Sequence, residues 1–230
     1  ADDVELPLTG LRFPPLDLDE TLAQQLLLLR AALLLAGQLG ELPAERTGVI
    51  VGLQCDAEVG RYGARLRLPQ WLAEWRRALG LEPDEGWLAA AREGVGAVRR
   101  SAGVVGAMPN IPANRVCSQL DLSGQSFTVA AEELSGVVGL QLASRALRAR
   151  ELDAALVGAV DLSCEPVQEA AAAALLGPRR QIPGDAALLL CLQRRADALA
   201  AGREIFGLLE LEEAPAAGAF ERGAGPAARG

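Results

Sequence analysis

The sequence predicts an α/β fold, with a mostly parallel five-stranded sheet and helices on both faces. Three observations lead to this prediction. Apolar runs with β-branched residues occur at 46–52 and 152–160, as in strands buried on both faces. Residues 126–130 alternate like a strand, and 134–147 repeat with helical spacing. The strand at 126–130, the crossover helix at 134–147 and the strand at 152–160 together predict a βαβ unit, in which the two strands run parallel.

The composition is that of a globular protein. Half of the 230 residues are hydrophobic and 23% are charged, which suits one large α/β core. The formal net charge of −8 and the aromatic content of 3% argue against nucleic acid, which needs cationic surface and stacking side chains. The acidic N-terminus lacks the basic region of a signal peptide, so we expect a cytoplasmic location.

Histidine does not occur in the sequence, and this removes several enzyme classes together. Without imidazole the chain cannot form a Ser-His or Cys-His pair or a His-based metal site. Cys55, Cys117, Cys164 and Cys191 form no CxxC pair, so neither a zinc site nor a thioredoxin-like motif is predicted. We therefore expect structural thiols, no metal and no cofactor.

The first part of the chain is expected to form an arm followed by a long helix. Residues 1–18 are acidic and rich in proline, which predicts an irregular arm. Residues 19–39 are apolar with helical spacing, with Asp17 or Asp19 as the N-cap and Gly40 as the stop. Polar residues interrupt this run, so a buried helix is favoured over a membrane span.

Two helices are expected after the strand at 46–52. They open at 69–75 and at 84–88 and contain all three tryptophans, Trp71, Trp75 and Trp87. These tryptophans invite a binding role. At helical spacing, however, aromatic side chains more often serve packing, and we favour that interpretation.

The rest of the chain alternates between helices and strands. Residues 101–109 indicate a loop, 110–119 a helix with Pro112 near its start, and 121–124 a turn. Beyond the βαβ unit we expect a helix at 170–175, a turn at 178–184, a strand at 185–192, a helix at 194–200 and a strand at 204–211. Residues 19–213 are thus predicted to form one domain, and the Gly/Ala/Pro-rich residues 214–230 a flexible tail or linker.

The turn between 126–130 and 134–147 is the best place for chemistry. A side chain there lies at the N-terminus of a helix, where free N–H groups and the dipole favour negative charge. A cysteine would be activated at such a place, but the turn carries Glu132 and Glu133. Carboxylates in a first helical turn stabilise the helix by ~0.3–1 kcal/mol each. Helix capping is the simplest interpretation of this pair.

Several segments together resemble the N-terminal half of β-ketoacyl synthases of the thiolase superfamily. Their order and spacing both match that family. They are Asn-Arg-Val at 114–116, Asp-Leu-Ser-Gly-Gln-Ser-Phe-Thr-Val at 121–129, the helix beginning near Leu134 and the strand with its end at 152–162. Three flanking segments, at 24–26, 46–52 and 183–190, support the resemblance. It runs from about Leu16 to Leu209 and implies a thiolase-like half-fold.

In active members of that family, this turn carries the cysteine that accepts the acyl chain, and here Glu133 occupies its place. The two catalytic histidines belong to the family's C-terminal half. The resemblance therefore implies that this chain alone does not catalyse condensation. It looks most like the chain-length-factor or inactive synthase-like regions of polyunsaturated fatty acid and polyketide synthases.

The resemblance also implies a dimer. In the family, the strand before the turn pairs antiparallel with its counterpart across the dimer axis, and a free strand edge is usually paired or covered. Residues 107–112 would line the shared acyl tunnel, where side-chain size could limit chain length. The partner would be a second copy or an active ketosynthase domain. The residues expected at the seam and tunnel are Met108, Asn110, Gln125, Ser126, Phe127, Thr128, Val129 and Ala130.

Two alternatives stay open. One is a malonyl-thioester decarboxylase or acyltransferase that uses Glu132 or Glu133. A carboxylate would repel the malonyl carboxylate, which weakens the decarboxylase hypothesis. The other alternative is a docking module for acyl carrier protein.

Overall fold

The computed structural model describes residues 4–80, 85–164, 166–182 and 184–210. The chain divides into two compact units, Ala1–Arg194 and Arg195–Gly230. The helices and strands are α1 (Pro15–Asp19), α2 (Ala23–Ala36), β1 (Thr47–Leu53), α3 (Ala57–Leu79), α4 (Glu85–Val95), α5 (Ser101–Val105), α6 (Ile111–Leu120), β2 (Ser126–Val129), α7 (Ser135–Arg148), β3 (Ala154–Leu162), α8 (Pro166–Leu175), β4 (Asp185–Gln193) and α9 (Arg195–Ala200), with short 3-10 turns at Ala44–Arg46 and Pro178–Arg180. The predicted tail at 214–230 lies outside the described residues.

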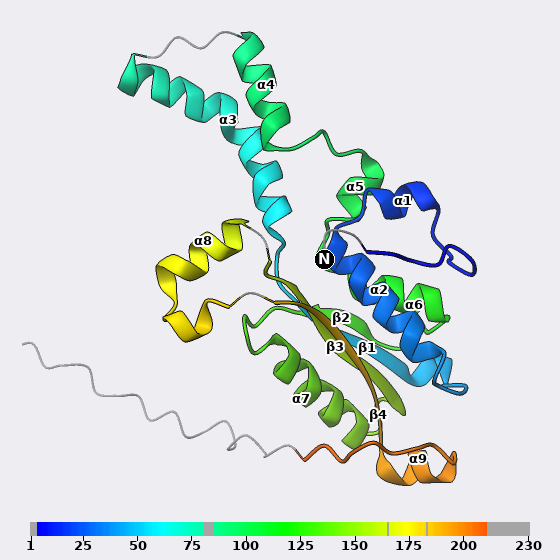
Figure 1. The fold of residues 1–230 in the computed structure, drawn as a ribbon. Coiled ribbons are helices and arrows are strands. Elements are labelled where there is room, and N and C mark those ends of the chain that lie inside the picture. The colour runs from blue at the N-terminus through cyan, green and yellow to red at the C-terminus, as the bar shows by residue number, and fades with distance from the viewer. Residues whose placement is uncertain (1–3, 81–84, 165, 183, 211–230) are drawn as a thin grey trace, which may run out of the picture. The chain divides into compact units, whose positions relative to one another are not determined.

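The first unit is built on a four-stranded sheet in the order β2-β1-β3-β4 (Figure 1). Strands β2 and β3 both pair parallel with β1, whereas β4 pairs antiparallel with β3. The predicted βαβ unit therefore exists, with β1 lying between its two strands. All seven residues of β1 are buried, as expected for a central strand covered on both faces.

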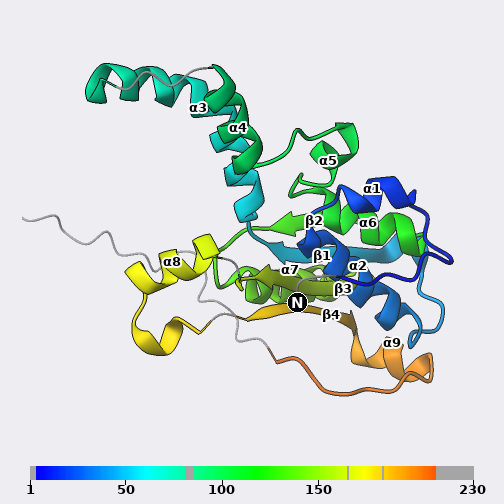
Figure 2. The same ribbon diagram turned by 45° about the horizontal axis from the view of Figure 1, so that its top comes forward.

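Helices cover both faces of the sheet, as predicted (Figures 1 and 2). On one face, α2 and α6 pack against side chains of β1 and β3, forming a core that includes Leu28, Val51 and Leu156. On the other face, α7 packs over Ile50 and Val157. Successive side chains of a strand point to opposite faces, so β1 contributes to both cores. This arrangement fixes α6, β2 and the start of α7 relative to one another.

The prediction of a fifth strand at 204–211 is wrong. The described part of that segment, residues 204–210, contains neither helix nor strand, and Phe206 is 90% exposed. A strand requires a neighbouring strand for its backbone hydrogen bonds, and apolar alternation alone does not provide one. The observed sheet therefore has four strands among the described residues.

The long helix predicted at 19–39 is observed as α2, but its predicted ends are wrong. Its N-cap and C-cap residues are Leu22 and Gly37, so neither Asp17 nor Asp19 caps it. Pro15 instead starts the separate short helix α1, because proline at a first helical position costs no hydrogen bond. Within the described chain, no helix is both long and apolar enough to span a membrane.

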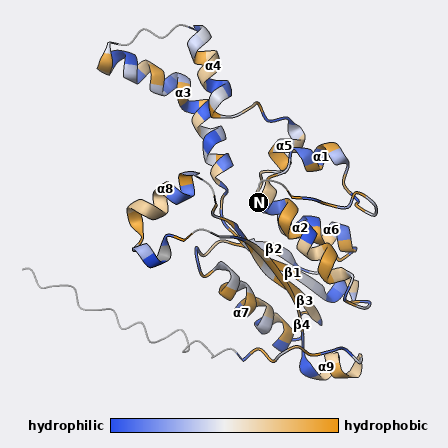
Figure 3. Ribbon diagram, viewed as in Figure 1, coloured by the Kyte–Doolittle hydropathy of each residue, from blue (hydrophilic) through white to orange (hydrophobic). Residues whose placement is uncertain are grey.

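The segment between β1 and α6 differs most from the prediction. Helix α3 begins at Ala57, twelve residues before Pro69, which lies inside it. Residues 101–105, expected as a loop, form α5. Hydrophilic residues are spread along α3 (Figure 3), and its principal packing partner is α4. Trp75 and Trp87 are 40% and 47% exposed, so the predicted packing role is only partly fulfilled.

Candidate functional site

The turn between β2 and α7 is tightly closed by backbone hydrogen bonds. Leu134 N donates to Ala131 O at 3.0 Å, and Ser135 N donates to Glu132 O at 3.1 Å. Glu132 has a φ of 51°, in the left-handed region that non-glycine residues rarely adopt. Such a conformation persists only where the surrounding structure enforces it.

Ser135 supplies part of that enforcement. Its buried side chain accepts a hydrogen bond from Ala131 N at 2.9 Å and donates one to Glu132 O at 2.6 Å. Ser135 was not among the site residues predicted from the sequence. A serine at the start of an apolar helical repeat is the signal that could have revealed it.

The start of α7 also lies directly against the end of β1. A Cβ atom on Gly52 would stand 2.9 Å from Gly136 N and 2.9 Å from Ser135 C. Only glycine permits so close an approach between a strand and a helix end. The position of the turn over the carboxyl end of the sheet is therefore fixed by the packing of α7 on β1.

Glu132 and Glu133 are both exposed on this turn. Helix α7 has Leu134 as its N-cap, and its first turn contains no acidic residue. The prediction that the two carboxylates lie in the first helical turn is therefore wrong. Because the closed turn spans residues 131–134, α7 begins only at Ser135, and both glutamates precede the helix.

The predicted seam residues lie on β2 and at its ends. Ser126, Phe127, Thr128 and Val129 form β2 and are half-buried, whereas Gln125 and Ala130 are exposed and flank the strand. Val49 N donates to Gln125 O at 2.8 Å. Hydrogen bonds of a parallel pair involve alternate residues. The backbone groups of Phe127 therefore point to β1, and those of Ser126 and Thr128 point to the outer edge.

That outer edge of β2 has no neighbouring strand in the part of the chain that the structure describes. Helix α6 packs against β2, and Ser126 Oγ donates to Asn114 Oδ1 of α6 at 2.8 Å. Met108 and Asn110, the predicted tunnel residues, are exposed in the connection between α5 and α6. This connection leads directly into α6, which packs against both β1 and β2.

The four thiols differ in how far they are buried. Cys117 is buried on α6, and burial raises the pKa of its thiol despite a hydrogen bond with Ser126. This agrees with the structural role predicted for it. Among the residues described, no cluster of three His, Cys, Asp or Glu side chains could hold a metal ion.

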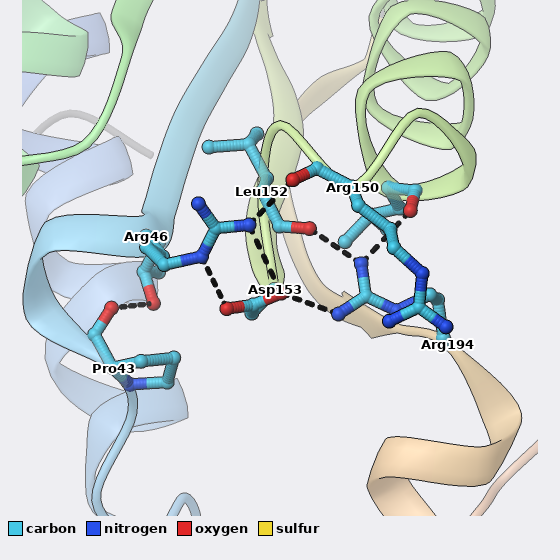
Figure 4. Close-up of polar contacts among 8 residues, drawn as sticks. Pro43, Arg46, Arg150, Leu152, Asp153 and Arg194 are labelled. Carbon is cyan, nitrogen blue, oxygen red and sulfur yellow. Dashed lines mark hydrogen bonds and ion pairs between the residues drawn. The ribbon is translucent and has the colours of Figure 1, made fainter.

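A cluster of polar side chains lies at the opposite end of the sheet (Figure 4). Asp153 binds both Arg46 and Arg194, and hydrogen bonds from these guanidinium groups lower its pKa to about 2. Arg194 also donates to the carbonyls of Leu147 at 2.8 Å and Leu152 at 2.6 Å. The cluster joins the start of β1, the end of α7, the start of β3 and the end of β4.

The sequence matches the family model of the β-ketoacyl synthase N-terminal domain over residues 11–180. A polyketide synthase of Burkholderia thailandensis, ThaG, is 34% identical over 134 residues, which is 53% of this chain and 2% of that protein. The chain thus spans only a small part of this relative.

Solved structures share the fold. A ketosynthase from module 6 of the bacillaene synthase of Bacillus subtilis superposes with a TM-score of 0.60 at 23% identity, covering 84% of this chain and 31% of that one. The ishigamide ketosynthase/chain length factor gives a TM-score of 0.57 at 16% identity, covering 83% of this chain and 48% of that one. The chain spans less than half of either structure.

Proposed function

The chain belongs to the family of β-ketoacyl synthase N-terminal domains, and from this premise we propose that it is a non-condensing member. In this proposal it acts as a structural or chain-length-determining partner in a thiolase-fold dimer of a fatty acid or polyketide multienzyme. We assign the domain to residues 19–213, preceded by the arm at 1–18. Its partner is a second copy or an active ketosynthase domain.

The observation that carries the proposal is Glu133 on the turn before α7. The resemblance to the family implies that Glu133 takes the place of the acyl-accepting cysteine, and its side chain is exposed on the turn. A carboxylate is a poorer nucleophile than a thiolate, and no histidine exists in the chain to act as an acid or base. The absence of a cysteine at this turn and of histidine from the given sequence supports the proposal that this chain does not catalyse condensation by itself.

The free edge of β2 supports pairing. Its outward N–H and C=O groups, on Ser126 and Thr128, need partners, and an antiparallel strand from another subunit would supply them. The strand is short, with four residues, so most of the interface would come from neighbouring side chains. Half-buried Phe127 and Val129 suit such a role.

The connection between α5 and α6 supports a role in chain length. Met108 is 41% exposed in the connection that leads into α6, the helix that packs against β2. A flexible apolar side chain there could contact a bound acyl chain from the partner's active site. Its size would then limit the length of chain that fits.

Incubation with a malonyl thioester tests the non-condensing assignment. We expect no release of carbon dioxide and no acyl group attached to the chain. Glu133→Gln should leave this result unchanged, because the carboxylate performs no chemical step. Release of carbon dioxide that depends on Glu133 would overturn the proposal and favour a decarboxylase or acyltransferase. Saturable binding of acyl carrier protein without any dimer would favour the docking module.

A further inference from the structure

Gln25 is a buried polar residue that holds the connection between α5 and α6. It lies in the first turns of α2 and is 2% exposed. Its Nε2 donates to Gly106 O at 2.7 Å and to Met108 O at 3.2 Å. Burying an amide in an apolar core is costly unless its polar atoms are hydrogen-bonded. These two bonds satisfy the Nε2 group, whereas the buried Oε1 has no hydrogen-bond partner among the described residues.

The same connection is fixed at its other backbone groups. Leu22 N donates to Gly106 O at 3.1 Å, Met108 N donates to Val105 O at 3.2 Å, and Ile111 N donates to Met108 O at 3.2 Å. A Cβ atom on Gly106 would stand 2.6 Å from Thr21 Cα, so the backbone there lies directly against the chain before α2. The N–H and C=O groups of Met108 are thus both engaged, while its side chain is 41% exposed.

Because both backbone groups of Met108 are bonded, the position and direction of its Cα–Cβ bond are fixed, and the flexible side chain extends from that point. From this arrangement we propose that Gln25 is a positioning residue, which sets where Met108 points and thereby the acyl chain length that the dimer accepts. The inference rests on the proposed function, because it assumes that Met108 contacts the acyl chain. Gln25 itself, buried beneath the connection, does not contact that chain.

Gln25→Met is the informative substitution. Methionine keeps the length and approximate volume of the side chain but donates no hydrogen bond. Gly106 O keeps its bond from Leu22 N and Met108 O keeps its bond from Ile111 N, so no carbonyl is left without a donor and the protein should fold. Gln24→Met is the matched control. Gln24 is also buried on α2, and in the described structure its side chain makes no hydrogen bond to residues 106–108.

Two measurements on the intact synthase that carries this chain test the inference. Hydrogen exchange at Met108 N and Ile111 N should accelerate by roughly five- to thirtyfold in Gln25→Met, because local opening becomes easier. With a malonyl thioester as extender, mass spectrometry should show a changed distribution of product chain lengths. Gln24→Met should leave both quantities at their original values.

The outcomes separate the inference from the proposed function. If Gln25→Met exchanges as slowly as Gln24→Met, Gln25 does not position the connection and the inference is wrong. If exchange accelerates but chain lengths stay constant, while Met108→Trp shortens the products, the inference is wrong and the proposed function stands. If Met108→Trp also leaves the lengths unchanged in an assembled dimer, the chain-length role itself fails, and the inference fails with it.

Discussion

Thr128→Pro should weaken the dimer without unfolding the sheet. Phe127 directs its backbone groups to β1, so Thr128, the next residue, directs its N–H to the free edge. Proline removes that N–H, and edge strands tolerate it because no hydrogen bond within the sheet is lost. Thr128→Val is the control, since valine keeps the N–H and a similar side-chain shape.

The magnitude follows from the number of bonds removed. In a homodimer with antiparallel β2 strands, the substitution removes one donor from each subunit. A net contribution of about 0.5–1.5 kcal/mol per hydrogen bond gives about 1–3 kcal/mol in all. The dissociation constant should therefore rise by roughly 5- to 150-fold. Pairing with a different synthase subunit would involve only one such donor, so the loss would be about 0.5–1.5 kcal/mol and the dissociation constant would rise by roughly 2- to 12-fold.

Sedimentation equilibrium over a concentration series measures this constant for both variants. Circular dichroism of each variant checks that the fold is unchanged. If Thr128→Pro and Thr128→Val dissociate at the same concentration, the β2 edge is not the interface and the assignment of the seam is wrong.

Three further predictions concern the fold. The pKa of Asp153 is about 2 in the folded protein and near 3.9 in an unfolded chain. Its ionised carboxylate therefore stabilises the fold above about pH 4, and this stabilisation is lost as the pH falls through 2. In Asp153→Asn, the free energy of unfolding, measured by denaturant titration, should depend less on pH in this acid range. Gly158→Ala should destabilise the sheet by about 1–3 kcal/mol, because the new Cβ would stand 2.1 Å from Leu188 O, and thermal unfolding will show it. Alkylation at pH 8 should modify exposed Cys55 quickly and Cys117 only after unfolding, since Cys117 is buried and the pKa of its thiol is raised, as peptide mass mapping can show.

The sequence predicts best those elements whose own side chains decide the structure. Strands β1 and β3 have apolar runs that suit burial on both faces, and α7 has an apolar repeat that fits one face of the sheet. The segment at 204–211 has the same local character, yet its described part forms no strand. A strand forms only beside a neighbouring strand, and the local sequence pattern does not show whether such a neighbour is available.

Helix α3 shows how a strong local signal can mislead. Pro69 favoured a helix start at that residue, because proline suits the first turn. In the structure Pro69 lies inside a 23-residue helix that begins behind the N-cap Asp56, whose carboxylate accepts from Glu58 N at 2.9 Å. Gly60 and Gly63 precede the proline, and because glycine disfavours helix interiors, no helix was predicted over this part of the segment.

The candidate site was located from sequence, but its geometry was not. Glu132 and Glu133 were expected on the turn and lie there, because the strand and helix on either side are strongly patterned. The left-handed backbone at Glu132 and the two hydrogen bonds of the Ser135 side chain depend on how closely α7 approaches Gly52. That approach is a property of tertiary packing, which no local pattern encodes.

Condensation by an active ketosynthase partner tests the central claim most directly. Product formation should be measured with the partner alone, with this chain added, and with its Glu133→Gln variant added. The product profile should depend on the presence of this chain and should be the same for the variant. A partner that performs equally well alone, or a variant that abolishes product formation, would contradict the claim that the chain acts through pairing and not through chemistry.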